Sequence, residues 1–95
     1  MIIVREVFIA KPGMASKLAR LMKSVMKEVA GARTTIMTDL TGQFNKVVVA
    51  TEFDNLQAFE NRMKDYGQNP GLRDRMMGYT EMYLYGKREV YQVVE

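Results

Sequence analysis

The stretch that most constrains this chain of 95 residues runs from Thr34 to Phe53, TTIMTDLTGQFNKVVVATEF. Residues 33–40 alternate threonine with apolar side chains, as edge strands do, and residues 41–45 (TGQFN) have the composition of a turn. The return segment, residues 46–53, contains the apolar run Val47-Val48-Val49-Ala50, which is typical of a strand buried on both faces. The stretch therefore predicts an antiparallel hairpin with one edge strand and one central strand.

A second strand with two apolar faces is predicted at the N-terminus. Ile2–Ala10 is rich in β-branched residues and stops at Lys11-Pro12-Gly13. Side chains alternate along a strand, so one face carries Ile3, Arg5, Val7 and Ile9, and the other carries Ile2, Val4, Glu6, Phe8 and Ala10. Both faces are largely apolar, which places this strand in the centre of a sheet as well.

Two helices and a last strand complete the predicted order. Residues 14–30 repeat apolar side chains at three- and four-residue steps, as an amphipathic helix does, and Gly31 ends them. Asp54-Asn55-Leu56-Gln57 has the spacing of a capping box with Asp54 as N-cap, and the helix that follows breaks at residues 67–71, before a short helical segment at 72–77. The last strand is predicted over 80–94, with a bulge or bend at Gly86 and enough length to run past its own sheet.

The order βαββαβ predicts an α+β, ferredoxin-like fold in a single domain, residues 1–95. Right-handed crossovers place both helices on one face of a four-stranded antiparallel sheet and leave the other face bare. A bare apolar sheet face on so small a chain exceeds the few hundred Å² (roughly) that soluble monomers expose. We therefore expect a homodimer through the open sheet face, in which two sheets close into a barrel around a central cavity.

The composition excludes several classes of chemistry. The sequence has no cysteine, histidine or tryptophan, which removes disulfides, thiolate metal sites, Ser-His-Asp catalysis, zinc sites of the usual type and histidine-ligated haem. No glycine-rich phosphate loop is present. We accordingly predict neither a metal nor a cofactor.

Nucleic acid and membrane partners are not expected either. The net charge of +3 is spread along the chain with acids interleaved, and residues 45–53 offer aliphatic side chains where an RNA-recognition strand needs aromatic ones. The apolar runs are too short to span a bilayer, and Arg5 and Glu6 interrupt the N-terminus before a signal-peptide core could form. A cytoplasmic location is the expectation.

Polar residues on otherwise apolar strands are the candidates for chemistry. Glu6, Glu52 and Tyr83 are the candidate catalytic residues, because a carboxylate beside phenols can act as a general base on an acidic carbon or phenol. Phe8, Met37 and Tyr85 are the candidate lining of a ligand cavity. An alternative remains open, in which the carboxylates pair with Arg5, Arg33 or Arg88 at a rim and the tyrosines simply pack at a dimer interface.

Four local features carry a resemblance that covers nearly the whole chain: Ile9–Gly13 before a helix, the Thr38–Gly42 turn, the passage from Glu52-Phe53 into Asp54-Asn55-Leu56, and the Asn69-Pro70 break before Leu72. With these features the sequence resembles the dimeric α/β-barrel superfamily, and within it the antibiotic-biosynthesis-monooxygenase-like and NIPSNAP-like proteins. Members of that superfamily include cofactor-free oxygenases of aromatic polyketides, haem-degrading enzymes and lactone isomerases. The haem-degrading members commonly use a histidine and a tryptophan in the cavity, so the absence of both residues argues against that branch.

Two hypotheses of different class follow. In the first, a small homodimeric barrel binds an apolar or aromatic small molecule and acts on it as a cofactor-free monooxygenase or isomerase. In the second, the protein is a non-catalytic ligand-binding or protein-interaction module, and its barrel is filled by Phe8, Met37, Met82 and the tyrosines.

Overall fold

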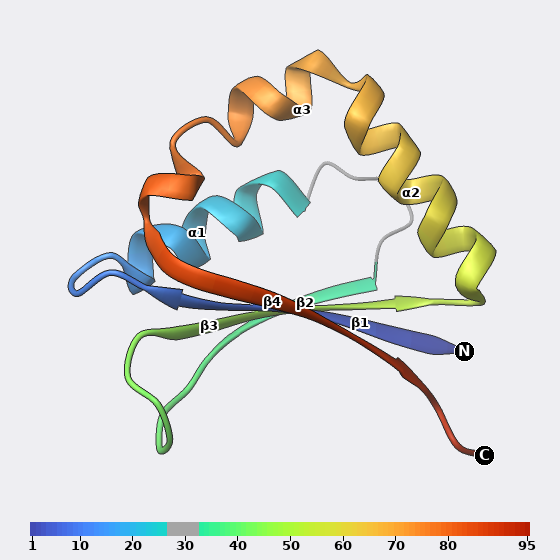
Figure 1. Ribbon diagram of the computed structural model, residues 1–95, viewed down its shortest axis with the longest axis horizontal. Coiled ribbons are helices and arrows are strands. Elements are labelled where there is room, and N and C mark those ends of the chain that lie inside the picture. Colours follow the sequence, from blue (N-terminus) through green and yellow to red (C-terminus); the bar gives the residue numbers. More distant parts are fainter. Residues whose placement is uncertain (27–32) are drawn as a thin grey trace.

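The computed structural model describes residues 1–26 and 33–95, and it confirms the α+β, ferredoxin-like fold (Figure 1). Four antiparallel strands form one sheet in the spatial order β2-β3-β1-β4, so the two strands predicted to be central are central. The strands are β1 (Ile2–Ala10), β2 (Arg33–Thr38), β3 (Lys46–Phe53) and β4 (Tyr83–Gln92). The helices are α1 (Ala15–Met26), α2 (Leu56–Gln68), α3 (Pro70–Arg75) and the short 3-10 turn η1 (Tyr79–Glu81).

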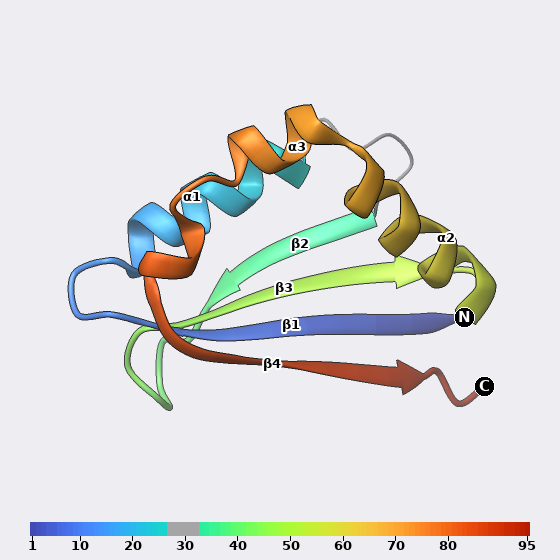
Figure 2. The ribbon, with the colours of Figure 1, turned by 45° about the horizontal axis from the view of Figure 1, so that its top comes forward.

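The α-helices cover one face of the sheet and leave the other face open (Figure 2). The register between β1 and β3 pairs Val7 with Val48 and Phe8 with Val47. Side chains alternate, so the first of these pairs points to the open face and the second points to the helices. The chain is correspondingly flat, with principal extents of 36 × 35 × 19 Å.

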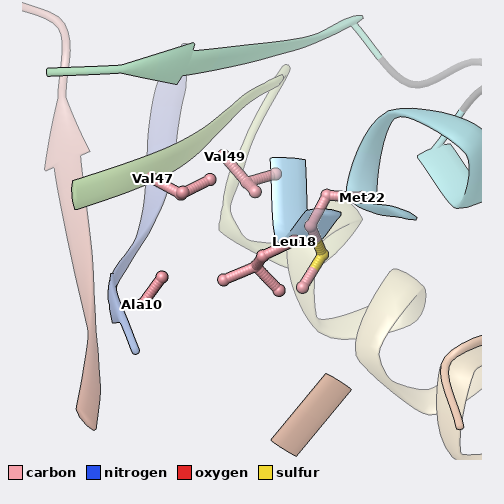
Figure 3. Close-up of a cluster of buried hydrophobic side chains, with 5 residues drawn as sticks. All are labelled: Ala10, Leu18, Met22, Val47 and Val49. Atoms are coloured by element: carbon pink, nitrogen blue, oxygen red, sulfur yellow. The ribbon is translucent and has the colours of Figure 1, made fainter. Parts of the chain in front are cut away.

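The core lies between the sheet and the helices. One buried cluster joins α1 to β1 and β3, as Figure 3 shows; it consists of Ala10, Leu18, Met22, Val47 and Val49. A second cluster joins Ile2, Val4 and Phe53 to Phe59 of α2. The stripe predicted for the first helix is confirmed at Leu18, Met22 and Val25, which are its buried residues. Its predicted continuation through residue 30 and its stop at Gly31 lie outside the described residues.

The second helix begins one residue later than predicted. Asn55, not Asp54, is the N-cap of α2, because the Asn55 side chain accepts a hydrogen bond of 2.9 Å from the backbone N–H of Ala58. Gln57 donates to Asn61 instead of closing a capping box. The predicted break within residues 67–71 is confirmed, since α2 ends at Gln68 and α3 begins at Pro70. Asn69 then caps α3.

The last strand is shorter than predicted. Gly78 has a left-handed backbone (φ 86°) and leads into η1, so β4 begins at Tyr83 and not at Thr80. The register shifts between Tyr83 and Tyr85, so the predicted bulge at Gly86 is two residues too late. The predicted overrun is wrong too, because the whole of β4 pairs with β1, from Gln92 opposite Ile2 to Tyr83 opposite Ala10.

Gly86 has a different role from the one predicted for it. It lies directly opposite Phe8 in the β1–β4 register, and a Cβ at this position would lie 3.1 Å from Cδ1 of Phe8 and 3.2 Å from the carbonyl oxygen of Val7. The missing side chain therefore gives the Phe8 ring room to lie over the edge strand, an aromatic cover that stabilises a glycine in a sheet.

Within residues 1–26 and 33–95, no helix is long and apolar enough to cross a membrane.

Candidate functional site

A pocket of about 540 Å³ lies within the chain, between the helix-covered face of the sheet and the helices. Strands β1, β3 and β4 form one wall, and α1, α2, α3 and η1 contribute the other. Four methionines line it, two from α1, one from α2 and one from the end of α3: Met22, Met26, Met63 and Met76. Methionine is unbranched and polarizable, so these walls can adjust to the shape of an apolar occupant.

Three aromatic rings form a cluster on the sheet side of the pocket. Phe8 and Tyr83 have ring centroids 5.0 Å apart, Tyr79 and Tyr83 lie 5.8 Å apart, and Tyr79 meets Phe8 edge-on at 6.5 Å. The register shift in β4 brings Tyr83 opposite Ala10, on the helix-covered face, and η1 brings Tyr79 beside it. These three rings come together only when the strands pair, so their proximity does not follow from the sequence alone.

The Tyr79 phenol is a hydrogen-bond donor and not a base at ordinary pH. Burial raises its pKa above the usual 10.0, and the neighbouring Tyr83 raises it further through its charge and a hydrogen bond. The hydroxyl therefore stays protonated.

An ion pair forms the polar end of the pocket. Glu6 of β1 and Arg88 of β4 are directly opposite in the register, and Nε of Arg88 donates to Oε1 of Glu6 over 2.6 Å. The guanidinium of Arg88 also lies over the ring of Phe59, 5.6 Å from its centroid. Both contacts fix the guanidinium beside the pocket that it lines.

The sheet separates the six predicted site residues into two groups. Glu6, Phe8 and Tyr83 line the pocket. The other three lie on the opposite face: Glu52, Met37 and Tyr85. Residues that alternate along strands divide between two faces, so one cavity within the chain cannot collect both groups.

The alternative in which the carboxylates pair with arginines is confirmed for both glutamates. Glu6 pairs with Arg88, and Glu52 of β3 pairs with Arg33 of β2 at 3.6 Å. On the open face, Tyr85 accepts a hydrogen bond of 3.1 Å from Gln43, and Met37 remains 42% exposed.

Several pocket residues escaped the sequence analysis. The sequence predicts Arg88 only as a possible partner of a carboxylate at a rim, and Tyr79 lies just before the predicted strand 80–94. Met22 and Met26 fit the apolar stripe of the first predicted helix and are therefore expected in the core, because helix periodicity alone cannot distinguish a packed core from a cavity wall. Within the described part of the chain, no group of three or more acidic side chains could hold a metal ion.

No family model matches the sequence, and no curated protein matches it. The fold does match solved structures. An uncharacterized NIPSNAP domain protein from Burkholderia xenovorans has a TM-score of 0.85 at 11% identity, over 99% of this chain and 95% of that one. A NIPSNAP family protein from Agrobacterium tumefaciens has a TM-score of 0.85 at 8% identity, over 99% and 86%.

A candidate antibiotic biosynthesis monooxygenase from Deinococcus radiodurans has a TM-score of 0.74 at 19% identity, over 100% of this chain and 94% of that one. The class defined by the fold is therefore α+β with a ferredoxin-like sheet. Within that class, the chain has the fold of NIPSNAP and antibiotic-biosynthesis-monooxygenase-like proteins, and the resemblance stated from the sequence is confirmed at this level.

Proposed function

We propose that this protein binds an apolar or aromatic small molecule in the pocket between its sheet and its helices. The observation that carries the proposal is the pocket of about 540 Å³ with methionine walls, one aromatic cluster and one polar end. Ligand pockets usually have volumes of about 300–1,000 Å³, are lined mainly by apolar and aromatic side chains, and hold a few polar groups that orient the ligand. The cysteine-free sequence supports a cytoplasmic setting for this activity.

The proposal includes a second copy of the chain on the open sheet face. Large apolar side chains are exposed there on the outer strands, namely Met37, Tyr85 and Tyr91. The chain exposes 6480 Å² in all, whereas a compact monomer of 10.9 kDa exposes about 5,600 Å². The excess of about 900 Å² is close to the roughly 800 Å² that one partner buries in an interface of standard size.

Paired charges on this face also favour a two-fold contact. Arg5 lies 3.4 Å from Glu89, and Lys87 lies 3.3 Å from the same carboxylate. A face that carries both signs can meet its own copy without net repulsion, as the self-complementary surface of a two-fold dimer requires.

A second candidate function is enzymatic, and Glu6 favours it. This carboxylate lines the pocket beside the aromatic cluster, where it could remove a proton from an acidic carbon of the bound molecule and return it to another carbon, as a cofactor-free isomerase does. A monooxygenase would use the same deprotonation before reaction with dioxygen. Glu6→Gln tests this candidate once a ligand is known: unchanged turnover would remove Glu6 from the mechanism.

Binding can be tested with N-phenyl-1-naphthylamine, an uncharged aromatic probe whose fluorescence rises in apolar surroundings. We expect saturable binding with one site per chain. Met76→Trp places a larger ring at the pocket wall and should weaken binding by about tenfold or more, because the indole takes up space that the probe would occupy.

The matched control is Met77→Trp, since the neighbouring Met77 is 76% exposed and does not line the pocket. Equal effects of the two substitutions, or fluorescence that rises without saturation, would count against the pocket as a binding site.

A further inference from the structure

The charges at the pocket are unbalanced toward positive. Among the residues that the structure describes, the charged ones in its lining are Glu6, Arg73, Lys87 and Arg88. Lys87 lies opposite Val7, which points to the open face of the sheet, and its ammonium group pairs with Glu89 at 3.3 Å. The charge of Lys87 therefore lies on the open face and not in the pocket. Two guanidinium groups and one carboxylate remain.

Arg88 has hydrogen-bonding capacity to spare. Its Nε donates to Glu6, and its two terminal nitrogens make no hydrogen bond to any of the described residues. The guanidinium fork matches a carboxylate when two N–H groups point the same way, and contacts on one side of an arginine hold that geometry in place. Glu6 and the Phe59 ring supply such contacts, which makes Glu6 a positioning residue for Arg88.

Arg73 adds a second cation to the pocket lining from α3. One of its terminal nitrogens donates to the carbonyl oxygen of Gly67 near the end of α2, which ties the side chain to the helix layer. Glu6, the sole carboxylate among the described residues of this lining, is already neutralised by Arg88. The pocket therefore favours an anion over a cation as the polar part of its occupant.

Resting on the proposed function, we propose that the occupant is a planar aromatic carboxylate. Its ring lies against the Phe8–Tyr79–Tyr83 cluster and the methionine walls, and its carboxylate accepts hydrogen bonds from the terminal nitrogens of Arg88. Arg73 strengthens the attraction without having to touch the ligand.

Two small molecules of nearly the same shape test the charge. 1-Naphthoate and 1-naphthamide are each used to displace N-phenyl-1-naphthylamine from the wild-type protein. We expect 1-naphthoate to compete about tenfold more strongly than 1-naphthamide, because a charge-assisted hydrogen bond is roughly twice as strong as a neutral one. The advantage should shrink as salt is added, since a partly exposed ion pair is screened.

Three variants locate the effect. The double variant Glu6→Gln/Arg88→Met removes one charge of each sign, so the net charge of the pocket is unchanged, and it should abolish the preference for 1-naphthoate. Arg88→Lys keeps a cation beside Glu6 but lacks the planar fork, and it should reduce the preference to a lesser degree. Arg20→Met is the control, because Arg20 lies on the exposed side of α1 outside the pocket lining.

The outcomes separate the two proposals. If the uncharged probe saturates but wild-type protein binds 1-naphthoate and 1-naphthamide alike, the carboxylate site is overturned and the apolar pocket stands. A preference that survives in the folded double variant, or that Arg20→Met reduces equally, likewise overturns the role of Arg88. If the probe itself does not saturate, the proposed function fails and this inference fails with it.

Discussion

The carboxylate of Asp39 organises the turn between β2 and β3. Its Oδ1 accepts hydrogen bonds from the backbone N–H groups of Thr41 (2.9 Å) and Gly42 (2.6 Å), and its Oδ2 accepts one from Gln43 (3.3 Å). Lys46 lies 3.7 Å from the same carboxylate. These interactions, the hydrogen bond from Gly42 foremost, lower the pKa of Asp39 below its usual value of 3.8.

This shift predicts a pH dependence of stability. A lowered pKa in the folded state means that the ionised carboxylate stabilises the fold in full above the unfolded-state pKa, and that this contribution is lost as the pH falls through the lower folded-state value. We expect Asp39→Asn to lower the melting temperature at neutral pH, because Asn lacks the second oxygen that accepts from Gln43. The difference in melting temperature between wild type and variant should become smaller below about pH 4.

Thermal melts followed by circular dichroism between about pH 2.5 and 7, at constant ionic strength, measure that gap. A gap of the same size at both ends of the range would show that the charge of Asp39 does not matter to the turn. The sequence alone identifies the turn from its residue types, but it does not reveal that one carboxylate satisfies three backbone donors.

Helix α2 shows how far local sequence reasoning reaches at the level of elements. Asp54 and Asn55 are both good N-cap residues, and Gln57 favoured Asp54 through the capping-box spacing. The structure selects Asn55, whose side chain bonds Ala58, while Asp54 pairs with Arg33 at 3.2 Å across the end of β2. A tertiary contact thus decided between two caps of equal local merit.

The two caps can be distinguished by substitution. Asn55→Ala should lower the free energy of unfolding by about 1 kcal/mol, because it leaves a backbone N–H at the start of α2 without its acceptor. Asp54→Ala should change it by less than about 0.5 kcal/mol, since it removes only an exposed ion pair. Urea denaturation of both variants measures the difference, and a larger loss for Asp54→Ala would restore the capping box.

For the strands too, the sequence predicts some features and misses others. The continuous apolar runs of β1 and β3 predicted their central positions, because only a strand covered on both faces tolerates such a pattern. The sequence predicts the last strand from Thr80 onward, yet Tyr79–Glu81 forms a 3-10 turn after the left-handed Gly78. That turn and the nearby register shift bring Tyr79 and Tyr83 to the pocket. The candidate site could therefore be predicted only in part, through Glu6, Phe8 and Tyr83.

For the whole molecule, alternation predicts two faces but not which of them encloses a cavity. The pocket between the sheet and the helices is lined in part by α2 and α3, elements far from α1 in sequence. The open face raises a separate question of assembly. Its centre is apolar, and the half-buried Ala50 of β3 lies there between Arg5 and Thr35 of the neighbouring strands.

Ala50→Lys tests whether this face meets a second copy. In an isolated chain the longer side chain can extend into solvent from the open face, whereas in a face-to-face dimer it must be buried beside Arg5, at the cost of an unpaired charge. We expect light scattering after size exclusion to give twice the chain mass of 10.9 kDa for wild type and the single-chain mass for the variant. Gln57→Lys, which adds the same charge on the exposed side of α2, should remain dimeric. A wild-type protein that is monomeric at micromolar concentration would overturn the dimer, and a dimeric Ala50→Lys would move the contact to another face.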